Sequence, residues 1–328
     1  EDIPSYEIGI SLKDFSFDPY HIDLISANLD LDIGRLTKRL ANKKAKYIVL
    51  NQKIDKQKKE YFQSIKIPGI VIRNRTFKRH YPQGEIFSQL IGLTNYKNEG
   101  VSGIEFALEE TLRPENGFQE KFLSRKSGVI QSKIIKKPTN GTDVKLTVDS
   151  KLQFILFSKL KKAVEFHDAE SASGIMIDLS SNEILAMTNF PSFDPNNRKQ
   201  LKNMELLKNN SAIALFEPGS TVKPLALLAL LENDSKIIES KVNTSPGWIE
   251  FEGYRTEDAR NYGTLSAEEI IAKSSNVGMV KLCADFDPNQ ILQTYYSFGF
   301  GKYINEIFIS TREGYLPEFK NLSLREKV

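Results

Sequence analysis

The stretch "FEPGSTVKPLALLALL" (residues 216–231) joins a sharp turn, a serine–lysine pair and a continuous apolar run. Pro218-Gly219 favours the turn. Pro224 is tolerated at a helix start because its nitrogen has no intrahelical partner in the first turn. We therefore predict an apolar helix after Ser220, and we expect it to be buried because it is hydrophobic on every side.

Ser220 and Lys223 are three residues apart, so their side chains share one face of that helix. A serine hydroxyl needs a nearby base to become a nucleophile. A lysine is such a base when apolar surroundings lower its pKa, and a helix N-terminus stabilises developing negative charge. The alternative is a plain helix start with a serine cap and a solvated lysine. The pattern alone is weak, because Ser158-x-x-Lys161 repeats it on the polar face of another predicted helix.

A second polar group, Ser274-Ser275-Asn276, interrupts two helical patterns downstream. A hydroxyl and an amide at such a break can face the nucleophile across a cleft. We expect Ser274 to pass a proton between Lys223 and a leaving amine, and Asn276 to hydrogen-bond a substrate amide. The same three letters at 180–182 are explained by turn chemistry.

The N-terminal part shows mixed secondary-structure signals. Two short strands are predicted at 47–52 and 69–74, with a Lys-rich helix between them. Frequent glycines from 84 to 141 favour an extended, β-rich region. Residues 144–148 alternate as a strand does, and a domain boundary is placed near residue 143.

The C-terminal part favours helices around a sheet. Asp149 or Ser150 is expected to cap a helix whose apolar face carries Leu152, Ile155, Leu156, Leu160, Ala163 and Val164. Residues 174–179 and 183–189 indicate a hairpin, and Ser266-x-x-Glu269 a capping box. The predicted fold class is α+β, with a β-rich mixed domain at 1–143 and a domain at 144–328 in which helices pack on an antiparallel sheet.

Composition excludes some classes of protein. The chain has 328 residues, of which 40% are hydrophobic, enough for two domains with their own cores. No stretch is apolar for long enough to cross a bilayer. Cys283 is the only cysteine, so no internal disulfide forms. The three histidines show no ligand spacing, which predicts no metal site: His21, His80 and His167.

Positive charge gathers in the first half, with 25 Lys and Arg against 19 Asp and Glu in residues 1–150. One interpretation is a surface that faces anionic lipid or nucleic acid, and the other is the solvated face of helices. No zinc-finger spacing or RNP-type motif supports nucleic acid, so none is expected as a partner.

Through Ser220-x-x-Lys223 and Ser274-x-Asn276 the chain resembles the penicillin-binding protein family, whose signature joins S-x-x-K, S-x-N and K-[TS]-G. The resemblance extends over nearly the whole chain, through "GVSGIEFALEETL" (100–112), "NEILAMTNFPSFDPNN" (182–197) and "FGFG" (298–301). It is similar to class B, the monofunctional transpeptidases with an N-terminal pedestal domain. Within class B, "FEPGSTVKP" and "KSSNVG" resemble the septal, cell-division type.

The resemblance implies a peptidoglycan D,D-transpeptidase that β-lactams inhibit and that needs no cofactor. Ser220 would be the acylated nucleophile, Lys223 its base, and Ser274 with Asn276 the second motif. The implied substrate is a stem peptide ending in D-Ala-D-Ala. Implied partners are membrane proteins of the division complex, including a SEDS-family glycosyltransferase. The implied place is the periplasmic face of the cytoplasmic membrane, with a single anchor upstream.

One element of the family pattern is missing after the second motif. No K-[TS]-G follows Asn276, and Lys126-Ser127-Gly128 spells it upstream, where we interpret it as chance. We therefore expect the C-terminal part of the transpeptidase domain to be absent from this chain, and the activity of the chain alone stays open. The alternatives are a non-catalytic fragment that acts as a binding or scaffold module of the division complex, and a serine β-lactamase or β-lactam sensor. The segment around Gly103-Ile104-Glu105 argues against the latter pair.

Two more expectations concern single features. Glu105 is expected to pair with an arginine of a segment upstream of this chain. The polar loop 191–200 is expected either to line the cleft or to be a plain solvated connection.

Overall fold

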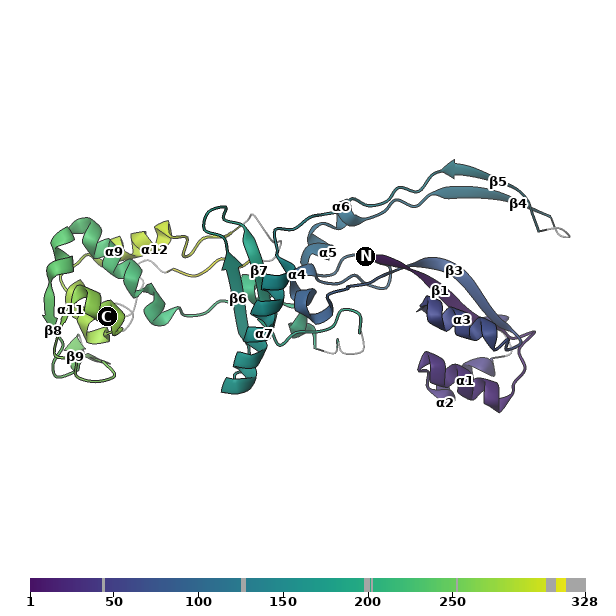
Figure 1. Cartoon of the computed structure of the whole chain (residues 1–328), viewed down its shortest axis with the longest axis horizontal. Helices are drawn as coiled ribbons and strands as arrows, with labels where there is room; N and C mark the ends of the chain where they lie inside the picture. Colours follow the sequence, from purple (N-terminus) through teal and green to yellow (C-terminus); the bar gives the residue numbers. More distant parts are fainter. Residues whose placement is uncertain are drawn as a thin grey trace. The chain divides into compact units, whose positions relative to one another are not determined.

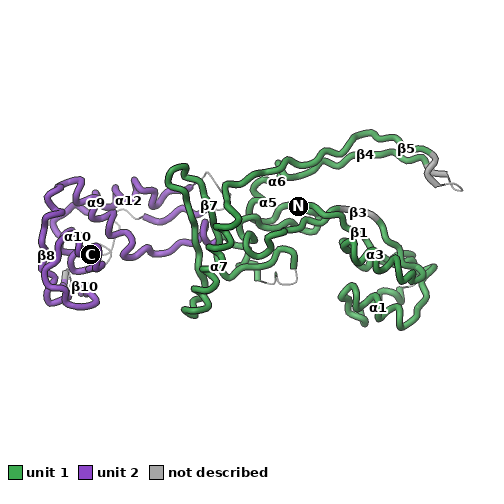
Figure 2. The backbone as a smooth tube through the Cα atoms, viewed as in Figure 1, with its two compact units in different colours: residues 1–209 green, residues 210–328 purple. Residues whose placement is uncertain are grey.

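The computed structural model describes residues 1–42, 45–124, 128–197, 201, 203–251, 253–304 and 311–316. The chain forms two compact units, residues 1–209 and 210–328 (Figure 2). The domain boundary near residue 143 stays a prediction. The predicted α+β class is confirmed, and every paired strand among the described residues is antiparallel.

The first unit begins with a three-stranded sheet of order β2-β1-β3 (Figure 1). Each of its three helices begins at an aspartate whose carboxylate accepts a backbone N–H of the first turn. Together they enclose one core that includes Ile8, Ile25 and Phe62. The two predicted strands and the Lys-rich helix are thus confirmed. The elements are β1 (Asp2–Ser11), α1 (Pro19–Leu29), α2 (Ile33–Leu40), β2 (Tyr47–Ile54), α3 (Lys56–Ser64) and β3 (Ile70–Arg79).

The glycine-rich region is only partly extended. Its second half is the predicted β structure, a hairpin of β4 (Phe118–Ser124) and β5 (Gly128–Lys136). Lys126 and Ser127, of the upstream K-S-G, lie outside the described residues. The β-rich prediction is wrong for the first half, which forms the short helices η1 (Gly84–Phe87), α4 (Ser88–Ile91), α5 (Gly103–Ala107) and α6 (Glu109–Leu112).

Close backbone packing explains this error. Gly92 has a φ of +78°, and a Cβ placed there would lie 1.8 Å from the Ser102 carbonyl oxygen. Gly103, with a φ of +58°, would in turn meet the Gly92 nitrogen at 2.6 Å. These glycines allow short helices to touch backbone to backbone, a role that a count of turn residues does not distinguish from strand ends.

Helix α7 (Ser150–His167) lies against the hairpin of β6 (Ala172–Ile177) and β7 (Ile184–Phe190) (Figure 1). The Asp149 cap and the hairpin are confirmed. The apolar face is narrower than predicted, because the buried residues are Gln153, Phe157 and Val164, whereas Ile155 is 40% exposed. A two-stranded hairpin covers only a narrow strip of a helix.

The strand expected at 144–148 is wrong. In the described chain no strand pairs with this segment, and its end is attached through Asp149 N–H, which donates to Leu185 O at 2.9 Å. An alternating pattern predicts the faces of a strand but does not provide its hydrogen-bonding neighbour.

Two amide side chains connect the hairpin to residues 81–89 of the same unit. Gln153 is fully buried and donates to Ile86 O and Met187 O, at 3.0 and 2.9 Å, while its Oε1 accepts from Met187 N–H at 2.8 Å. Asn196 exchanges two hydrogen bonds with the backbone of Tyr81, at 2.9 and 3.0 Å.

The described part of the loop at 191–200 is therefore more than a plain solvated connection, and its Pro195 lines a pocket of the first unit together with Tyr81 and Ser88. That the loop lines the cleft at Ser220 stays a prediction. Ser192 Oγ lies 2.7 Å from Ser88 Oγ, and Phe193 is 2% exposed in a cluster with Tyr81 and Leu93. The loop is an anchor that carries β7 onto the N-terminal part of the unit. Residues 198–200 lie outside the described residues.

The second unit collects helices around the apolar helix α9 (Lys223–Asn233). α10 (Ala267–Ala272) and α12 (Pro288–Ser297) pack on it. Its buried residues are Ala226, Leu227, Ala229 and Leu230, whereas Leu225 and Leu228 are half-buried, so burial on every side is confirmed only in part. Its other elements are α8 (Asn210–Ile213), η4 (Gly219–Val222), η5 (Ser235–Glu239), β8 (Lys241–Asn243), β9 (Trp248–Phe251), β10 (Tyr254–Glu257), β11 (Thr264–Ser266) and α11 (Asn276–Cys283).

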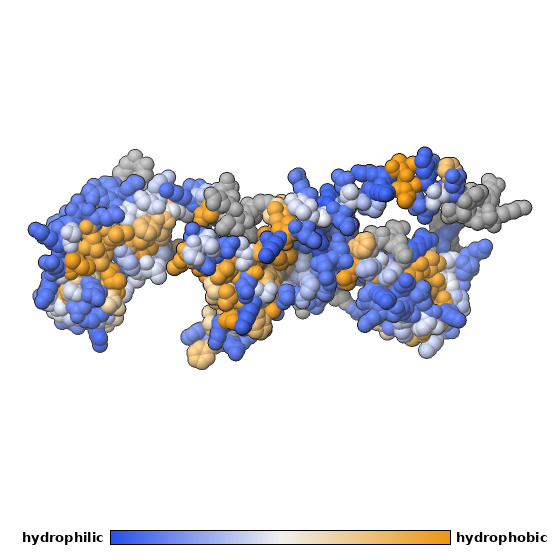
Figure 3. All heavy atoms as spheres, turned by 45° about the horizontal axis from the view of Figure 1, so that its top comes forward, coloured by the Kyte–Doolittle hydropathy of each residue, from blue (hydrophilic) through white to orange (hydrophobic). Residues whose placement is uncertain are grey.

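Apolar side chains also reach the surface of both units, where they show as orange in Figure 3. Leu179 is 91% exposed at the hairpin turn and Phe216 is 81% exposed before η4. None of the described helices combines the length and apolar character that a membrane span requires.

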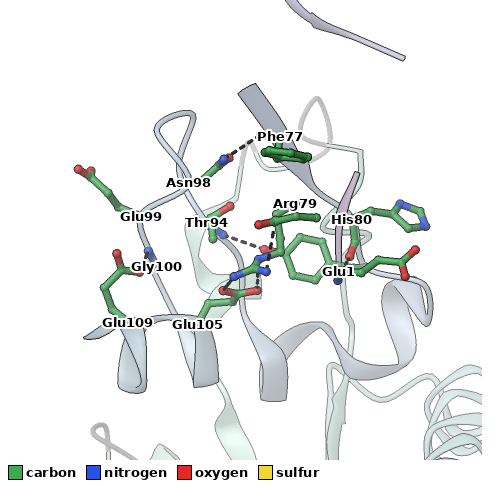
Figure 4. A network of polar contacts seen from close by, with 12 residues as sticks. Glu1, Phe77, Arg79, His80, Thr94, Asn98, Glu99, Gly100, Glu105 and Glu109 are labelled. Atoms are coloured by element: carbon green, nitrogen blue, oxygen red, sulfur yellow. Dashed lines mark hydrogen bonds and ion pairs between the residues drawn. The ribbon is translucent and has the colours of Figure 1, made fainter. Parts of the chain in front are cut away.

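A buried ion pair joins β3 to α5 in the first unit (Figure 4). Arg79 Nε lies 2.9 Å from Glu105 Oε1, and its Nη2 donates to Glu105 Oε2 at 3.1 Å. Asp2 approaches the same guanidinium at 3.3 Å. The partner of Glu105 is thus an arginine within this chain, which corrects the expectation of an upstream one. Burial raises the pKa of Glu105 above its usual value, and Arg79 opposes that shift.

We predict that Arg79→Gln lowers the free energy of unfolding by roughly 3–5 kcal/mol, because it leaves the Glu105 carboxylate buried without its cation. Without Arg79 the pKa of Glu105 rises further, so the carboxyl takes up a proton in the folded state as pH falls. The difference from the wild type should therefore shrink toward acidic pH. Urea unfolding at several pH values measures both effects.

Arg113→Gln is the matched control, since Arg113 also pairs with glutamates but is 58% exposed. Its cost should stay within about 1 kcal/mol. Equal costs for the two variants, or a cost of Arg79→Gln that grows on acidification, would contradict this account.

Candidate active site

The amine of Lys223, the first residue of α9, lies at the corner between α10 and α11. Its Nζ donates to Ser274 O at 2.7 Å, to Asn276 Oδ1 at 2.6 Å and to Ser274 Oγ at 3.2 Å. Three of the four residues selected from the sequence are therefore in direct contact, although 51 and 53 positions separate Lys223 from Ser274 and Asn276.

The corner has its shape because one helix ends and another begins within three residues. Ser274 N–H and Ser275 N–H close the end of α10 by donating to Ile271 O and Ile270 O. Ser275 Oγ then caps α11 by accepting Gly278 N–H at 2.8 Å. Ser274 between them has a φ of +54°, a left-handed conformation that costs a serine energy and is common at functional sites. This conformation leaves both its carbonyl and its hydroxyl facing the lysine.

Asp258 is a residue of this site that the sequence reasoning missed. It follows β10, and its carboxylate accepts Asn276 N–H, Val277 N–H and the Ser275 hydroxyl, at 2.6, 3.0 and 2.7 Å. No local pattern marks it, because its partners lie 17 to 19 positions away on another element.

The protonation of Lys223 is set by two opposed influences. Burial lowers the pKa of its amine below the ordinary lysine value, and the charge of Asp258 acts in the other direction. An ammonium group has three N–H donors, and the corner offers it three acceptors. A neutral amine has two donors and one lone pair, so one contact must change. Ser274 Oγ makes the longest of the three contacts and is the one hydroxyl among them, so it can turn and donate to the lone pair.

Ser220 lies in η4, directly before α9, and is exposed to solvent. Gly219 precedes it with a φ of +58°, and Thr221 Oγ1 donates to Pro218 O at 2.6 Å, so the turn is held locally. Within the described part of the chain, Lys223 bonds to Ser274 and Asn276 and makes no hydrogen bond to Ser220. Catalytic contacts often shorten only when substrate binds. The role of Ser220 stays a prediction.

Two family models match the chain. The model of the penicillin-binding protein dimerisation domain matches residues 1–146, and that of the penicillin-binding protein transpeptidase domain matches residues 172–326. The second range contains the complete corner around Lys223.

Curated relatives agree with these models. The peptidoglycan D,D-transpeptidase FtsI of Escherichia coli is 32% identical over 291 residues, which cover 88% of this chain and 49% of that protein. The probable peptidoglycan D,D-transpeptidase PenA of Neisseria meningitidis is 30% identical over 302 residues, which cover 91% of this chain and 51% of that protein. The chain thus spans about half the length of these relatives.

A solved structure shares the fold. The crystal structure of a peptidoglycan synthetase from Bifidobacterium adolescentis aligns with all of this chain and 64% of its own, with a TM-score of 0.65 and 20% identity. Matches to both family models and to FtsI over most of the chain, together with this common fold, lead to one assignment. The chain belongs to the penicillin-binding protein family and, within it, to the class B proteins of the FtsI type.

Proposed function

We propose that this chain takes part in the D,D-transpeptidase reaction that cross-links peptidoglycan during septal wall synthesis. The observation that carries the proposal is the Lys223 amine, whose pKa is lowered by burial and which contacts both Ser274 and Asn276. The similarity to FtsI, a peptidoglycan D,D-transpeptidase, and to PenA, a probable one, supports the same reaction.

In the proposed acylation, Ser220 Oγ attacks the carbonyl carbon between the two terminal D-alanines of a stem peptide. The Ser220 proton passes to the neutral Lys223 amine, an Oγ–C bond forms, and the C–N bond to the last D-alanine breaks. Ser274 passes a proton from Lys223 to the leaving nitrogen. An amine of a second stem peptide then attacks the ester and restores Ser220. β-Lactams enter the first step and remain bound, since their leaving nitrogen stays tethered.

The position of Asn276 suits substrate binding. Its Oδ1 accepts from Lys223, and its Nδ2 donates one hydrogen to Glu257 O at 2.9 Å. An amide nitrogen carries two hydrogens, so one donor is left for a carbonyl of the stem peptide or of the antibiotic.

The proposed place of action is the extracytoplasmic face of the cytoplasmic membrane, where stem peptides are cross-linked. The proposed partners are membrane proteins of the division complex, including a SEDS-family glycosyltransferase that supplies the glycan strands. The family match of residues 1–146 to a non-catalytic domain supports an assembly role for that part.

We predict that a fluorescent penicillin labels the full-length gene product at Ser220 and that Ser220→Ala abolishes the label. Ser158→Ala is the matched control, because Ser158 precedes Lys161 with the same spacing but lies on α7. In-gel fluorescence and mass spectrometry of the labelled peptide measure the result. Undiminished labelling of Ser220→Ala would refute the assignment, and rapid steady release of hydrolysed antibiotic would identify a β-lactamase instead.

We also predict that acylation accelerates with rising pH along a limb whose midpoint lies below 10.5, the ordinary lysine pKa, because burial lowers the pKa of Lys223. Lys223→Arg should slow acylation by about 10²–10⁴-fold, since a guanidinium stays protonated and removes the base. Stopped-flow acylation across pH measures both, with Lys161→Arg as the control expected to behave as the wild type. A Lys223→Arg rate near the wild-type rate would exclude the lysine as the base.

A further inference from the structure

We propose that Asp258 is a positioning residue of this active site, which fixes the Ser274–Asn276 corner and thereby aligns the Lys223 amine. The inference rests on the proposed function, because the alignment matters only if Lys223 acts as the base. Nothing in the family signature of S-x-x-K, S-x-N and K-[TS]-G names this residue.

Helix α11 has two caps. Ser275, at the position directly before the helix, already accepts Gly278 N–H at 2.8 Å, as an ordinary N-cap does. Asp258 is a second cap from a distant element, and it takes Asn276 N–H, Val277 N–H and the Ser275 hydroxyl. Ser275 and Val277 are completely buried. Ser275 satisfies only one of the free N–H groups of the first turn, and Asp258 accepts two others. Because Asp258 comes from another element, its carboxylate both completes the cap and ties the corner to the hairpin that carries it.

Asn276 is held at both its backbone and its side chain by two consecutive residues, Asp258 and Glu257. Asp258 Oδ1 accepts its backbone N–H at 2.6 Å, and Glu257 O accepts its Nδ2 at 2.9 Å. With Nδ2 fixed on a carbonyl, Oδ1 must face the other way, toward Lys223 Nζ at 2.6 Å. The chain of contacts therefore runs from Asp258 through Asn276 to the amine.

Asp258 is itself placed by a hairpin. It follows β10, which pairs with β9 so that Glu257 lies opposite Trp248. Asp258 N–H donates to Gly247 O at 2.9 Å, which fixes the residue to the turn before β9. Hydrogen bonds to a carboxylate are shorter and stronger than those between neutral groups. The hairpin thus holds the corner through three such bonds.

The charge of Asp258 also bears on Lys223. Among the other charged groups, Glu257 pairs with Arg255, Lys273 faces Glu269 at 3.6 Å, and Lys281 donates to Asn243 O. α12, packed on α9, carries no charged residue. α9 itself carries Glu232 near its opposite end. The Asp258 carboxylate is the charge that raises the pKa of Lys223 against the effect of burial.

Two variants separate orientation from charge. Asp258→Asn removes the charge and places an amide N–H₂ where one oxygen now accepts a hydrogen bond. Ser275→Ala removes one of the three bonds to Asp258, together with the Ser275 cap on Gly278 N–H, and leaves the charge. Asp287→Asn is the matched control, because Asp287 caps α12 in the same unit through Asn289 N–H and has no contact with the corner. The experiment measures fluorescent-penicillin acylation of the full-length gene product across pH, with a melting curve for each variant.

We expect Asp258→Asn to slow acylation about 10- to 100-fold at neutral pH, as small misplacements of catalytic groups do. Its ascending pH limb should move to lower pH, since the charge that favoured the ammonium form is gone. Ser275→Ala should slow acylation and leave the midpoint of the ascending pH limb unchanged. Asp287→Asn should match the wild type in both the acylation rate and the midpoint of the pH limb. A loss of folded protein alone lowers the labelled fraction and does not move the limb.

A folded Asp258→Asn protein with the wild-type rate and the wild-type limb overturns the inference. If Asp258→Asn does not fold, a wild-type rate in Ser275→Ala overturns it in the same way. Failure of the proposed function has a different signature, because the wild-type protein itself is then not labelled at Ser220.

Discussion

The site depends on one partly buried lysine amine that a single helix corner holds through its oxygens. Lys223 begins the most apolar helix of the second unit, and its amine is surrounded by the carbonyl, hydroxyl and amide oxygens of one helix corner. These acceptors are neutral, so they hydrogen-bond the ammonium without adding the full charge that would keep it protonated. The carboxylate of Asp258 is near, but it accepts the backbone N–H of Asn276 and is not among the hydrogen-bond partners of the Lys223 amine. This arrangement holds a lysine in place and still allows it to lose its proton.

The corner in turn requires a serine in an unfavourable conformation. Ser274 is left-handed, and the bonds that stabilise it come from both sides: the end of α10 before it, and Asp258 with Ser275 after it. Strain of this kind persists only where neighbours over-determine the backbone. The hairpin β9–β10 is such a neighbour, since Asp258 directly after it holds the residues that follow Ser274.

The first unit shows the same principle with neutral side chains. Gln153 and Asn196 satisfy backbone groups of segments that lie far away in the sequence, and each does so with both ends of its amide. They hold the hairpin β6–β7 and the loop after it on residues 81–89. Burial of a polar amide is tolerated there because every one of these bonds is made.

Local patterns were reliable where the cause is local. The Asp149 cap, the Ser266–Glu269 capping box and the hairpin at 174–189 depend on residues a few positions apart, and all were predicted. The strand at 144–148 and the β-rich reading of 84–112 were wrong, because a strand needs a partner and a glycine can serve a close helix contact as well as a turn. The partner of Glu105 was misplaced for a similar reason, since no pattern links it to Arg79, 26 positions away.

The sequence by itself determined the α+β class, the family, and the choice of Ser220, Lys223, Ser274 and Asn276, because motif spacing and side-chain chemistry are written along the chain. Only the tertiary structure decided which groups Lys223 contacts, that Asp258 accepts hydrogen bonds from the Ser274–Asn276 corner, and that the loop after β7 is an anchor. Those contacts join elements whose separation in sequence carries no periodic signal, and they exist only after the chain has folded.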